Sequence, residues 1–252
     1  MTTESDELDW IMQQCDCPIL FYDKMQVVGP SGINIERFDE KMKLEQNRRL
    51  VTYYSLLTQM RVNGGNDYIN LVNSILSGKC NQQACLENYD FKVMSDFNRF
   101  NNLQQKLEDE FTLSRMIAGY AWEWKSKKDK SLYDMELDGV KKQWNYRLEN
   151  WVLSEGADKQ VGCIHTIQGF DLNYGFVIMG NEIGYDPESK EIIVRPENYY
   201  DQNGRKTASK EELLEYIKHI YYVLMTRGIK GTYLYICDDN LRKYVSSIIG
   251  EI

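Results

Sequence analysis

The sequence predicts an α/β fold: a mostly parallel sheet with helices on both faces and a β-hairpin insertion. Short apolar runs that suit buried strands alternate with segments of helical periodicity, and the clearest helix is followed almost directly by an apolar strand. The chain has 252 residues, of which 42% are hydrophobic, which is enough for a substantial core without disulfides or metals. We therefore expect one large domain or two small ones.

The expected strands are short and either apolar or rich in β-branched and aromatic residues. In chain order they span residues 18–22, 50–57, 115–118, 161–164, 176–179 and 233–236. The first is closed by Asp23 and the turn over residues 29–32. Between Gly184 and Tyr200, with Asp186 and Pro187 opening the turn, the sequence predicts an exposed hairpin at one edge of the fold.

Two expected helices have clear ends. Asn66 is a candidate N-cap for a helix that Gly78 would end, and its apolar face holds Ile69, Val72, Ile75 and Leu76. Ser209 and Glu212 have the spacing of a capping box. An apolar stripe follows them as far as Leu224, and Gly228 then ends the second helix.

The composition excludes several classes of protein. Six cysteines fit no paired CxxC pattern and only two histidines are present, so we expect neither a metal site nor a disulfide scaffold. No apolar run has the roughly 18–20 residues of a membrane span, and the acidic start does not resemble a signal peptide. We therefore expect a cytoplasmic protein without a membrane partner. A net charge of −8 disfavours a generic nucleic-acid binder but leaves a local basic groove open.

Local motifs of complete enzymes are missing. No GxxxxGK[ST] occurs, because Gly78-Lys79 is followed by Cys80 and Asn73 stands at the position of the first glycine. The chain thus lacks the glycine loop that cradles nucleotide phosphates. It also contains neither GxSxG nor HExxH.

Four polar clusters lie at the ends of expected elements. They span residues 23–26, 59–61, 165–171 and 226–228. Ligands gather at the carboxyl ends of strands in open α/β sheets, so these clusters are expected to face one site. Their candidate site residues are Asp23, Gln26, Arg61, His165, Gln168, Gly169, Asp171, Thr226 and Arg227.

The order of these clusters resembles the later motifs of a superfamily 1 helicase. The segments TQMRVNGGNDYINLVNSIL, SRMIAGYAWEW, IHTIQGFDLNYGFVIMG and YVLMTRGIKGTYLYICD together resemble the Schlafen group 3-like DNA/RNA helicase domain of prokaryotes. The resemblance extends from about Pro18 to Tyr244. It implies a RecA-like fold, with residues 1–30 as the trailing strand and linker of a first RecA-like domain and residues 31–252 as the second.

The resemblance also implies roles for the candidate residues. Arg227 and Arg61 would act on the phosphates of ATP, and Gln26 would couple the γ-phosphate to movement. Nucleotide contacts would come from Asp23, Gln168, Gly169, Asp171 and Thr226. ATP and Mg²⁺ would be held by an upstream RecA-like domain of the same polypeptide, so the chain alone is expected to bind neither and to be inactive.

Aromatic and basic residues are interleaved between Tyr120 and Arg147. Trp122, Trp124, Lys127 and Lys128 are the candidates here for binding single-stranded DNA or RNA, together with His165. Five acidic residues share the stretch, so its excess of positive charge is small. Because Trp122 and Trp124 are two residues apart, at least one is expected in the core.

Structural roles compete with the functional ones. Arg227 could pair with a carboxylate, Arg61 could anchor the turn at Gly64-Gly65, and His165 could hold its own loop. Asp171 could favour a helix start through its charge alone. Two rival functions also stay open: a degenerate interaction module that kept the fold without the motor, and a nuclease using paired carboxylates such as Asp109-Glu110, for which no convincing partner set is visible.

Overall fold

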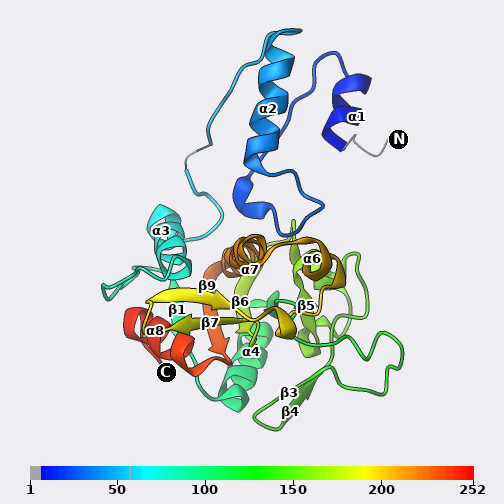
Figure 1. Ribbon diagram of the computed structural model, residues 1–252. Coiled ribbons are helices and arrows are strands. Elements are labelled where there is room, and N and C mark those ends of the chain that lie inside the picture. The colour runs from blue at the N-terminus through cyan, green and yellow to red at the C-terminus, as the bar shows by residue number, and fades with distance from the viewer. Residues whose placement is uncertain (1–6, 57) are drawn as a thin grey trace.

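An N-terminal helical part is joined to a larger α/β body in this computed structural model, which describes residues 7–56 and 58–252. The N-terminal part holds α1 (Glu7–Gln14), the 3-10 turn η1 (Lys24–Gln26) and α2 (Ile35–Gln46). Figure 1 shows α1 and α2 standing away from the body, with extended chain leading from α2 to α3 (Gly65–Leu76).

The body is built on a five-stranded sheet in the order β1-β9-β6-β2-β5, and every neighbouring pair is parallel. The strands are β1 (Asp90–Val93), β2 (Ser114–Ala118), β5 (Val161–Cys163), β6 (Leu172–Met179) and β9 (Gly228–Ile236). Parallel neighbours need crossover connections, and these are mainly helices. The predicted α/β class is confirmed.

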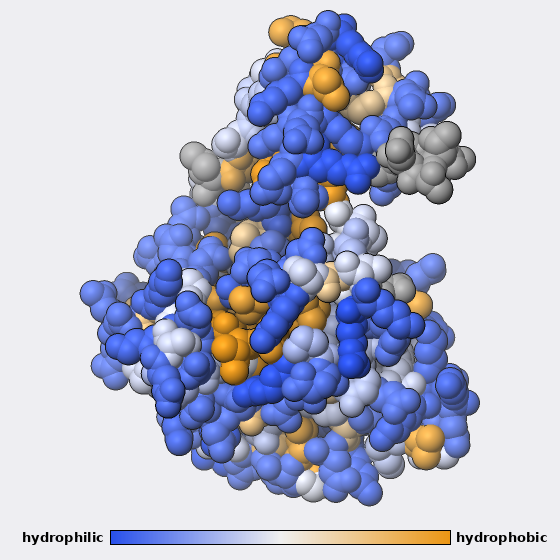
Figure 2. Space-filling view, viewed as in Figure 1, coloured by the Kyte–Doolittle hydropathy of each residue, from blue (hydrophilic) through white to orange (hydrophobic). Residues whose placement is uncertain are grey.

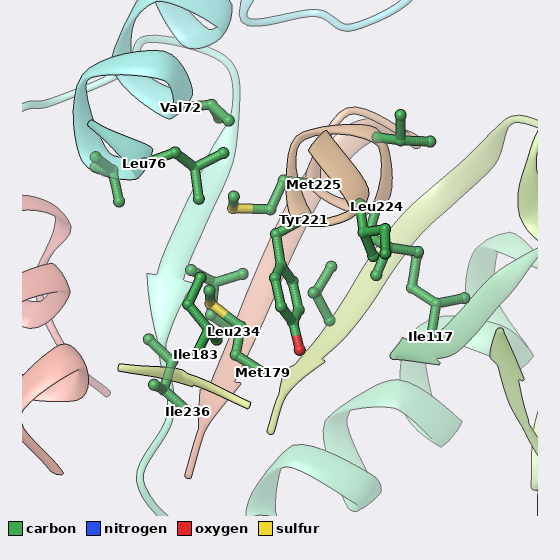
Figure 3. Close-up of a cluster of buried hydrophobic side chains, with 14 of the residues drawn as sticks. Val72, Leu76, Ile117, Met179, Ile183, Tyr221, Leu224, Met225, Leu234 and Ile236 are labelled. Atoms are coloured by element: carbon green, nitrogen blue, oxygen red, sulfur yellow. The ribbon is translucent and has the colours of Figure 1, made fainter. Parts of the chain in front are cut away.

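Helices cover both faces of the sheet because the central strands alternate their side chains between two cores. Ile117, Val177 and Leu234 point to the core that contains α3, α7 (Lys210–Met225) and α8 (Asp239–Ile249). Met116 and Phe176 point to the other core, beneath α4 (Phe97–Phe111). Figure 3 shows Tyr221, Leu224 and Met225 of α7 above β9, with Val72 and Leu76 of α3 beside them.

The two helices with predicted ends are confirmed with small differences. In α7 the Ser209 side chain accepts a hydrogen bond from the Glu212 N–H, and the Glu212 side chain accepts one from the Ser209 N–H. In α3 the N-cap is Gly64 rather than Asn66, whose side chain instead accepts from the Gln59 N–H at 3.0 Å. Gly78 follows that helix at a φ of +75°, a conformation that glycine adopts without strain.

The predicted hairpin is also present. It consists of β7 (Ile183–Asp186) and β8 (Glu191–Val194), which pair antiparallel. A second hairpin, β3 (Met135–Leu137) and β4 (Val140–Lys142), lies beside the α4 face. The remaining short elements are η2 (Trp151–Leu153), η3 (Ala157–Lys159), α5 (Ile164–Ile167), η4 (Pro196–Asn198) and α6 (Gln202–Thr207).

Two predicted strands are wrong. Residues 18–22 and residues 50–56 form no strand, and residue 57 lies outside the described part of the chain. Their apolar side chains are exposed instead: Phe21 is 87% exposed and Leu50 is 94% exposed. Residues with high strand propensity form strands when they can pack against neighbouring strands, and neither segment lies beside a strand. The prediction that residues 1–30 include the trailing strand of a first domain is therefore wrong with respect to that strand.

Candidate functional site

Two predicted site residues, Arg227 and Asp171, lie at the amino ends of two neighbouring strands of the sheet. Arg227 stands between the end of α7 and the start of β9, and Asp171 stands directly before β6. The Arg227 carbonyl accepts a hydrogen bond from the Leu172 N–H at 2.9 Å, which places the two connections side by side. The turn before α3 joins them, because the Asn63 N–H donates to the Ile229 carbonyl at 2.9 Å.

Arg61 and Asp171 form an ion pair across this edge. Arg61 Nε lies 2.6 Å from Asp171 Oδ1, and the two side chains keep 35% and 47% of their surfaces exposed. The Arg61 N–H also donates to Gln59 Oε1 at 2.7 Å. Two predicted site residues from segments more than a hundred positions apart are thus in contact, in a pair that water still reaches.

Arg227 differs from Arg61 because it is buried and has no counter-ion among the residues that the structure describes. Its exposed fraction is 2%, and its Nε donates to the Val223 carbonyl at 3.0 Å. Among the described residues, no carboxylate lies within ion-pairing distance of its guanidinium. Burial, and then the nearby charge of Arg61, lowers the Arg227 pKa to about 10, while Asp171, Tyr222 and Asp23 oppose that shift. The group still carries its charge at neutral pH.

Asp23 and Gln26 form a compact turn against α7. Asp23 Oδ1 accepts from the Met25 N–H at 2.9 Å, and Oδ2 accepts from the Gln26 side-chain amide at 3.0 Å. The His219 ring nitrogen Nδ1 lies 2.9 Å from the Val27 carbonyl, which ties this segment to α7. Asp23 is close enough to raise the pKa of Tyr222, after the larger effect of burial.

The other predicted site residues are Thr226, before β9, and three residues on the connection from β5 to β6: Gln168, Gly169 and His165, the last of which was predicted to bind nucleic acid. Thr226 is buried and its hydroxyl donates to the Val223 carbonyl at 3.2 Å. Gln168 caps the end of α5, and Gly169 follows it at a φ of +90°. His165 is exposed, and its ring lies 5.8 Å from that of Tyr120. No hydrogen bond within the described residues connects these four to the arginines directly.

The expectation that the clusters share a carboxyl edge is wrong, but Arg61, Asp171 and Arg227 lie close together, with Asp23 near enough for its charge to act on Arg227. The connection β5–α5–β6 carries Asp171 back to the start of β6, and α7 delivers Arg227 to the start of β9. Both residues therefore lie at the amino ends of their strands.

Comparison with known protein families decides the affiliation. Residues 1–238 match the family described as Schlafen group 3, DNA/RNA helicase domain. The chain belongs to this family. The resemblance found in the motifs is thereby confirmed.

One curated relative of this helicase domain is the uncharacterized protein YPL245W of Saccharomyces cerevisiae. It is 28% identical over 266 residues, covering 92% of this chain and 57% of the yeast protein. The chain thus spans little more than half of that relative, which is a eukaryotic protein and does not support a prokaryotic origin. No solved structure matches the chain. Among the described helices, none combines the length and apolar content needed to cross a membrane.

The aromatic residues predicted to bind nucleic acid have mixed positions in this helicase domain. Trp144 is buried, and the half-buried Trp122 and Trp124 rings lie 6.3 and 6.1 Å from it, so all three belong largely to the core. Lys127 and Lys128 are exposed, and Lys127 Nζ lies 5.6 Å from the Trp124 ring centre. The expectation that at least one tryptophan is in the core is confirmed.

Two exposed tyrosines lie in the same stretch. Tyr133 and Tyr146 are about half exposed. Lys141 Nζ lies 6.0 Å from the centre of the Tyr133 ring, and Lys130 Nζ lies 5.4 Å from the centre of the Tyr146 ring. This surface is near the carboxyl end of β9, because Asp138 Oδ2 accepts hydrogen bonds from the Phe97 N–H at 2.8 Å and the Tyr235 hydroxyl at 3.1 Å. Tyr235 is eight residues after Arg227, which at about 3.3 Å per residue is roughly 26 Å along β9.

A cavity of about 640 Å³ lies between the N-terminal part and the body. It is lined by residues of η1, α2, α3 and α7, among them Lys24, Met25 and His219, but not by Arg61, Asp171 or Arg227. Figure 2 shows a largely hydrophilic surface, with apolar atoms gathered on the body below the narrow connection.

Sequence reasoning missed several residues that support the site. Tyr222 shares the electrostatic environment of both arginines, and Tyr68, Tyr89 and Thr232 bind the backbone around Arg227. Tyr222 lies within YYVLMTRG and could have been noted from that motif. The other three lie in α3, before β1 and in β9, and no local pattern links them to Arg227.

Proposed function

We propose that this helicase domain is the second half of a nucleic-acid-dependent ATPase motor. In this proposal Arg227 and Arg61 bind the γ-phosphate of an ATP molecule that a separate P-loop domain holds. The observation that carries it is Arg227: a buried cation with no counter-ion among the described residues, beside a second arginine. A buried charge is costly when it is unpaired, and an anion brought in from outside would relieve that cost.

The chain's own residues would divide the work. Arg227 supplies a fixed guanidinium, whose Nε is already bonded to Val223, while Arg61 exchanges its exposed partner Asp171 for a phosphate oxygen. Two such cations stabilise the charge that develops on a transferring phosphoryl group. Gln26, held by Asp23 in the turn on α7, would couple the state of the phosphate to movement of the N-terminal part.

The residues of the described chain fit a triphosphate better than they fit its metal ion. The arginine pair offers planar donors suited to phosphate oxygens. No cluster of three or more His, Cys, Asp or Glu side chains suited to a metal lies within the described residues. We therefore assign Mg²⁺, which neutralises the phosphates in such motors, to the P-loop domain.

Exposed apolar side chains beside the cluster support a partner domain. Ile19 and Phe21, which precede Asp23, are 82% and 87% exposed, and Leu56 and Met60, which precede Arg61, are 86% and 91% exposed. The segments that lead to Asp23 and Arg61 thus expose large apolar side chains to water. Such surfaces are typical of a protein interface, and here they flank the edge to which ATP would be delivered.

Phosphate binding by the isolated chain tests this proposal. Two charge-assisted hydrogen bonds of about 1.5–3 kcal/mol each predict millimolar affinity for sodium tripolyphosphate. The signal of the Arg227 Nε–H group, identified by its loss in Arg227→Lys, should shift during an NMR titration of the arginine-labelled chain. Arg61→Lys should weaken binding, whereas Arg242→Lys, at an ion pair with Asp239 on α8, should not. An unshifted Arg227 signal would refute the proposal.

Hydrolysis by the chain alone is a second test. Without a P-loop or a metal cluster we expect no ATP turnover above ~0.1 per second, with or without nucleic acid. When a P-loop domain is joined to the chain, Arg227→Ala should lower turnover by roughly 10³-fold or more. Turnover by the isolated chain would contradict the division of the site between two domains.

We also propose that single-stranded nucleic acid binds the basic stretch at the opposite end of the sheet. The exposed lysines and the half-exposed tyrosines support this, since bases stack on aromatic rings beside cationic groups. An oligonucleotide should bind weakly, with an affinity that falls steeply with salt. The double variant Lys127→Glu, Lys128→Glu should abolish binding without lowering the melting temperature; unchanged binding would exclude this surface.

A further inference from the structure

The backbone that carries Arg227 is held on both sides by buried hydroxyl groups. The Tyr68 hydroxyl donates to the Met225 carbonyl at 2.7 Å, two residues before Arg227. The Tyr89 hydroxyl donates to the Gly228 carbonyl at 2.9 Å, one residue after it. Tyr68 has no exposed surface and Tyr89 only 6%, so water does not replace either bond.

Thr232 links these two contacts. Its Oγ1 atom lies 2.9 Å from the Tyr89 hydroxyl and 3.0 Å from the Met225 carbonyl, and its residue is fully buried. Each hydroxyl has one proton to donate. With Tyr68 donating to Met225 and Tyr89 donating to Gly228, the single Thr232 proton goes either to the Met225 carbonyl, which can accept two hydrogen bonds, or to the Tyr89 oxygen. The three side chains thus form one connected network.

The network joins three elements at the end of α7. Tyr68 comes from α3, Tyr89 precedes β1, and Thr232 lies within β9. The last carbonyls of a helix have no partner within the helix. Here one of them, Met225, is bound by side chains from elsewhere, so the exit of the chain from α7 has one fixed direction.

The rest of Arg227 is restricted in the same way. Its Nε bond to Val223 fixes the side chain against α7, and Gly228 allows the close approach of the Gly231 carbonyl, which any Cβ at position 228 would overlap. Among the described residues, none accepts a hydrogen bond from the two terminal nitrogens of the guanidinium. A guanidinium fixed in this manner loses little freedom when it binds a phosphate.

We infer that Tyr68, Tyr89 and Thr232 are positioning residues for Arg227. Their hydroxyls hold the turn from Met225 to Gly228 so that the guanidinium is preorganised for an anion. This inference rests on the proposed function, because it assigns Arg227 a phosphate to bind. None of the three needs to touch that phosphate.

The test compares isosteric variants that remove a hydroxyl. Tyr89→Phe and Thr232→Val are titrated with sodium tripolyphosphate while the Arg227 Nε–H signal is observed. Loss of one such hydrogen bond should weaken binding by roughly fivefold and broaden or split the Arg227 signal before any anion is added. The matched control is Tyr233→Phe, which removes the hydroxyl that contacts Asp90 from the other face of β9.

Melting temperatures measured on the same samples separate positioning from simple stability. At temperatures where both variants are folded, Tyr89→Phe should bind tripolyphosphate more weakly than the wild type, and Tyr233→Phe should bind it with unchanged affinity. This difference should hold even if both variants have lower melting temperatures. Thr232→Ser keeps the hydroxyl and should restore the wild-type affinity that Thr232→Val loses. Equal phosphate affinity in Tyr89→Phe, Thr232→Val and the wild type would overturn the inference.

The two failures are distinguishable. If the wild-type Arg227 signal does not respond to tripolyphosphate, the proposed function fails and this inference fails with it. If the wild type binds, Arg227→Lys abolishes binding and the hydroxyl variants bind normally, only the positioning role is refuted.

Discussion

Glu182 provides a quantitative test of the structure through its response to pH. Its side chain is buried between β6 and β7, where one oxygen accepts a hydrogen bond from the Tyr221 hydroxyl and the other has no partner among the described residues. Gly119 and Gly180 make the space: a Cβ at either position would lie 2.7 or 2.5 Å from a Glu182 oxygen. Burial raises the pKa of Glu182 from 4.5 to about 7, although the Tyr221 hydrogen bond opposes the shift.

The magnitude follows from this shift. A difference between 4.5 unfolded and about 7 folded corresponds to roughly 3 kcal/mol in the free energy of unfolding. Because the folded state holds the proton more tightly, this stabilisation is fully present below pH 4.5. It declines as the pH rises and is lost above about 7. Glu182→Gln removes the ionisation while keeping an oxygen for Tyr221.

The assay is urea unfolding followed by tryptophan fluorescence at several pH values between 4.5 and 8.5. Relative to the wild type, Glu182→Gln should gain roughly 3 kcal/mol of stability across this range, since contributions from other carboxylates cancel in the difference. Glu191→Gln, at an exposed glutamate of β8, should show no such trend. The Tyr221 hydrogen bond lowers the pKa of Glu182, so Tyr221→Phe should move the midpoint of the pH dependence to higher pH. A difference independent of pH would refute the burial of an ionisable Glu182.

Three further predictions concern the arginine cluster and the thiols. Arg227→Met removes an unpaired buried charge, so the melting temperature without anion should stay within a few degrees of wild type or rise, and tripolyphosphate should stabilise only the wild type. Asp171→Asn frees Arg61 from its ion pair and should tighten tripolyphosphate binding by up to about fivefold in the same NMR titration. Burial raises the pKa of the Cys237 thiol to about 12, so iodoacetamide at pH 8 should modify the exposed Cys15 and leave Cys237 intact, as read by peptide mass spectrometry.

The sheet was predictable wherever local pattern and tertiary packing agree. Strands such as 176–179 are apolar on both sides because both faces are covered, and the sequence shows that directly. Helix α4 was missed because its buried residues, Phe97, Phe100, Gln104 and Leu107, form a thin stripe in a polar segment. For residues 50–56 the error was the opposite one: a strand was predicted from composition where none forms. Their β-branched and aromatic residues suit a strand, but no strand of the described chain lies beside them.

The members of the site were predictable, but their arrangement was not. Motif order identified Arg61, Asp171 and Arg227 as candidates from segments far apart in the sequence. Their position at one edge of the sheet depends on how the connections between strands run. That is a property of the topology, which the motifs do not show. The hydroxyl network around Arg227 depends on tyrosines and a threonine from three elements, a combination that only the folded chain brings together.

The two arginines differ in a way that suits sequential use. Arg61 has Asp171 as a partner, but both are partly exposed, and an ion pair in that setting contributes only about 0–1 kcal/mol. Exchanging it for a phosphate therefore costs little. Arg227 has no ion-pair partner among the described residues, and hydrogen bonds already hold its side chain and backbone. In the proposed function, an incoming phosphate would thus meet a fixed cation without a counter-ion at Arg227 and an ion-paired cation at Arg61, so that release of Asp171 would distinguish a bound from an empty site.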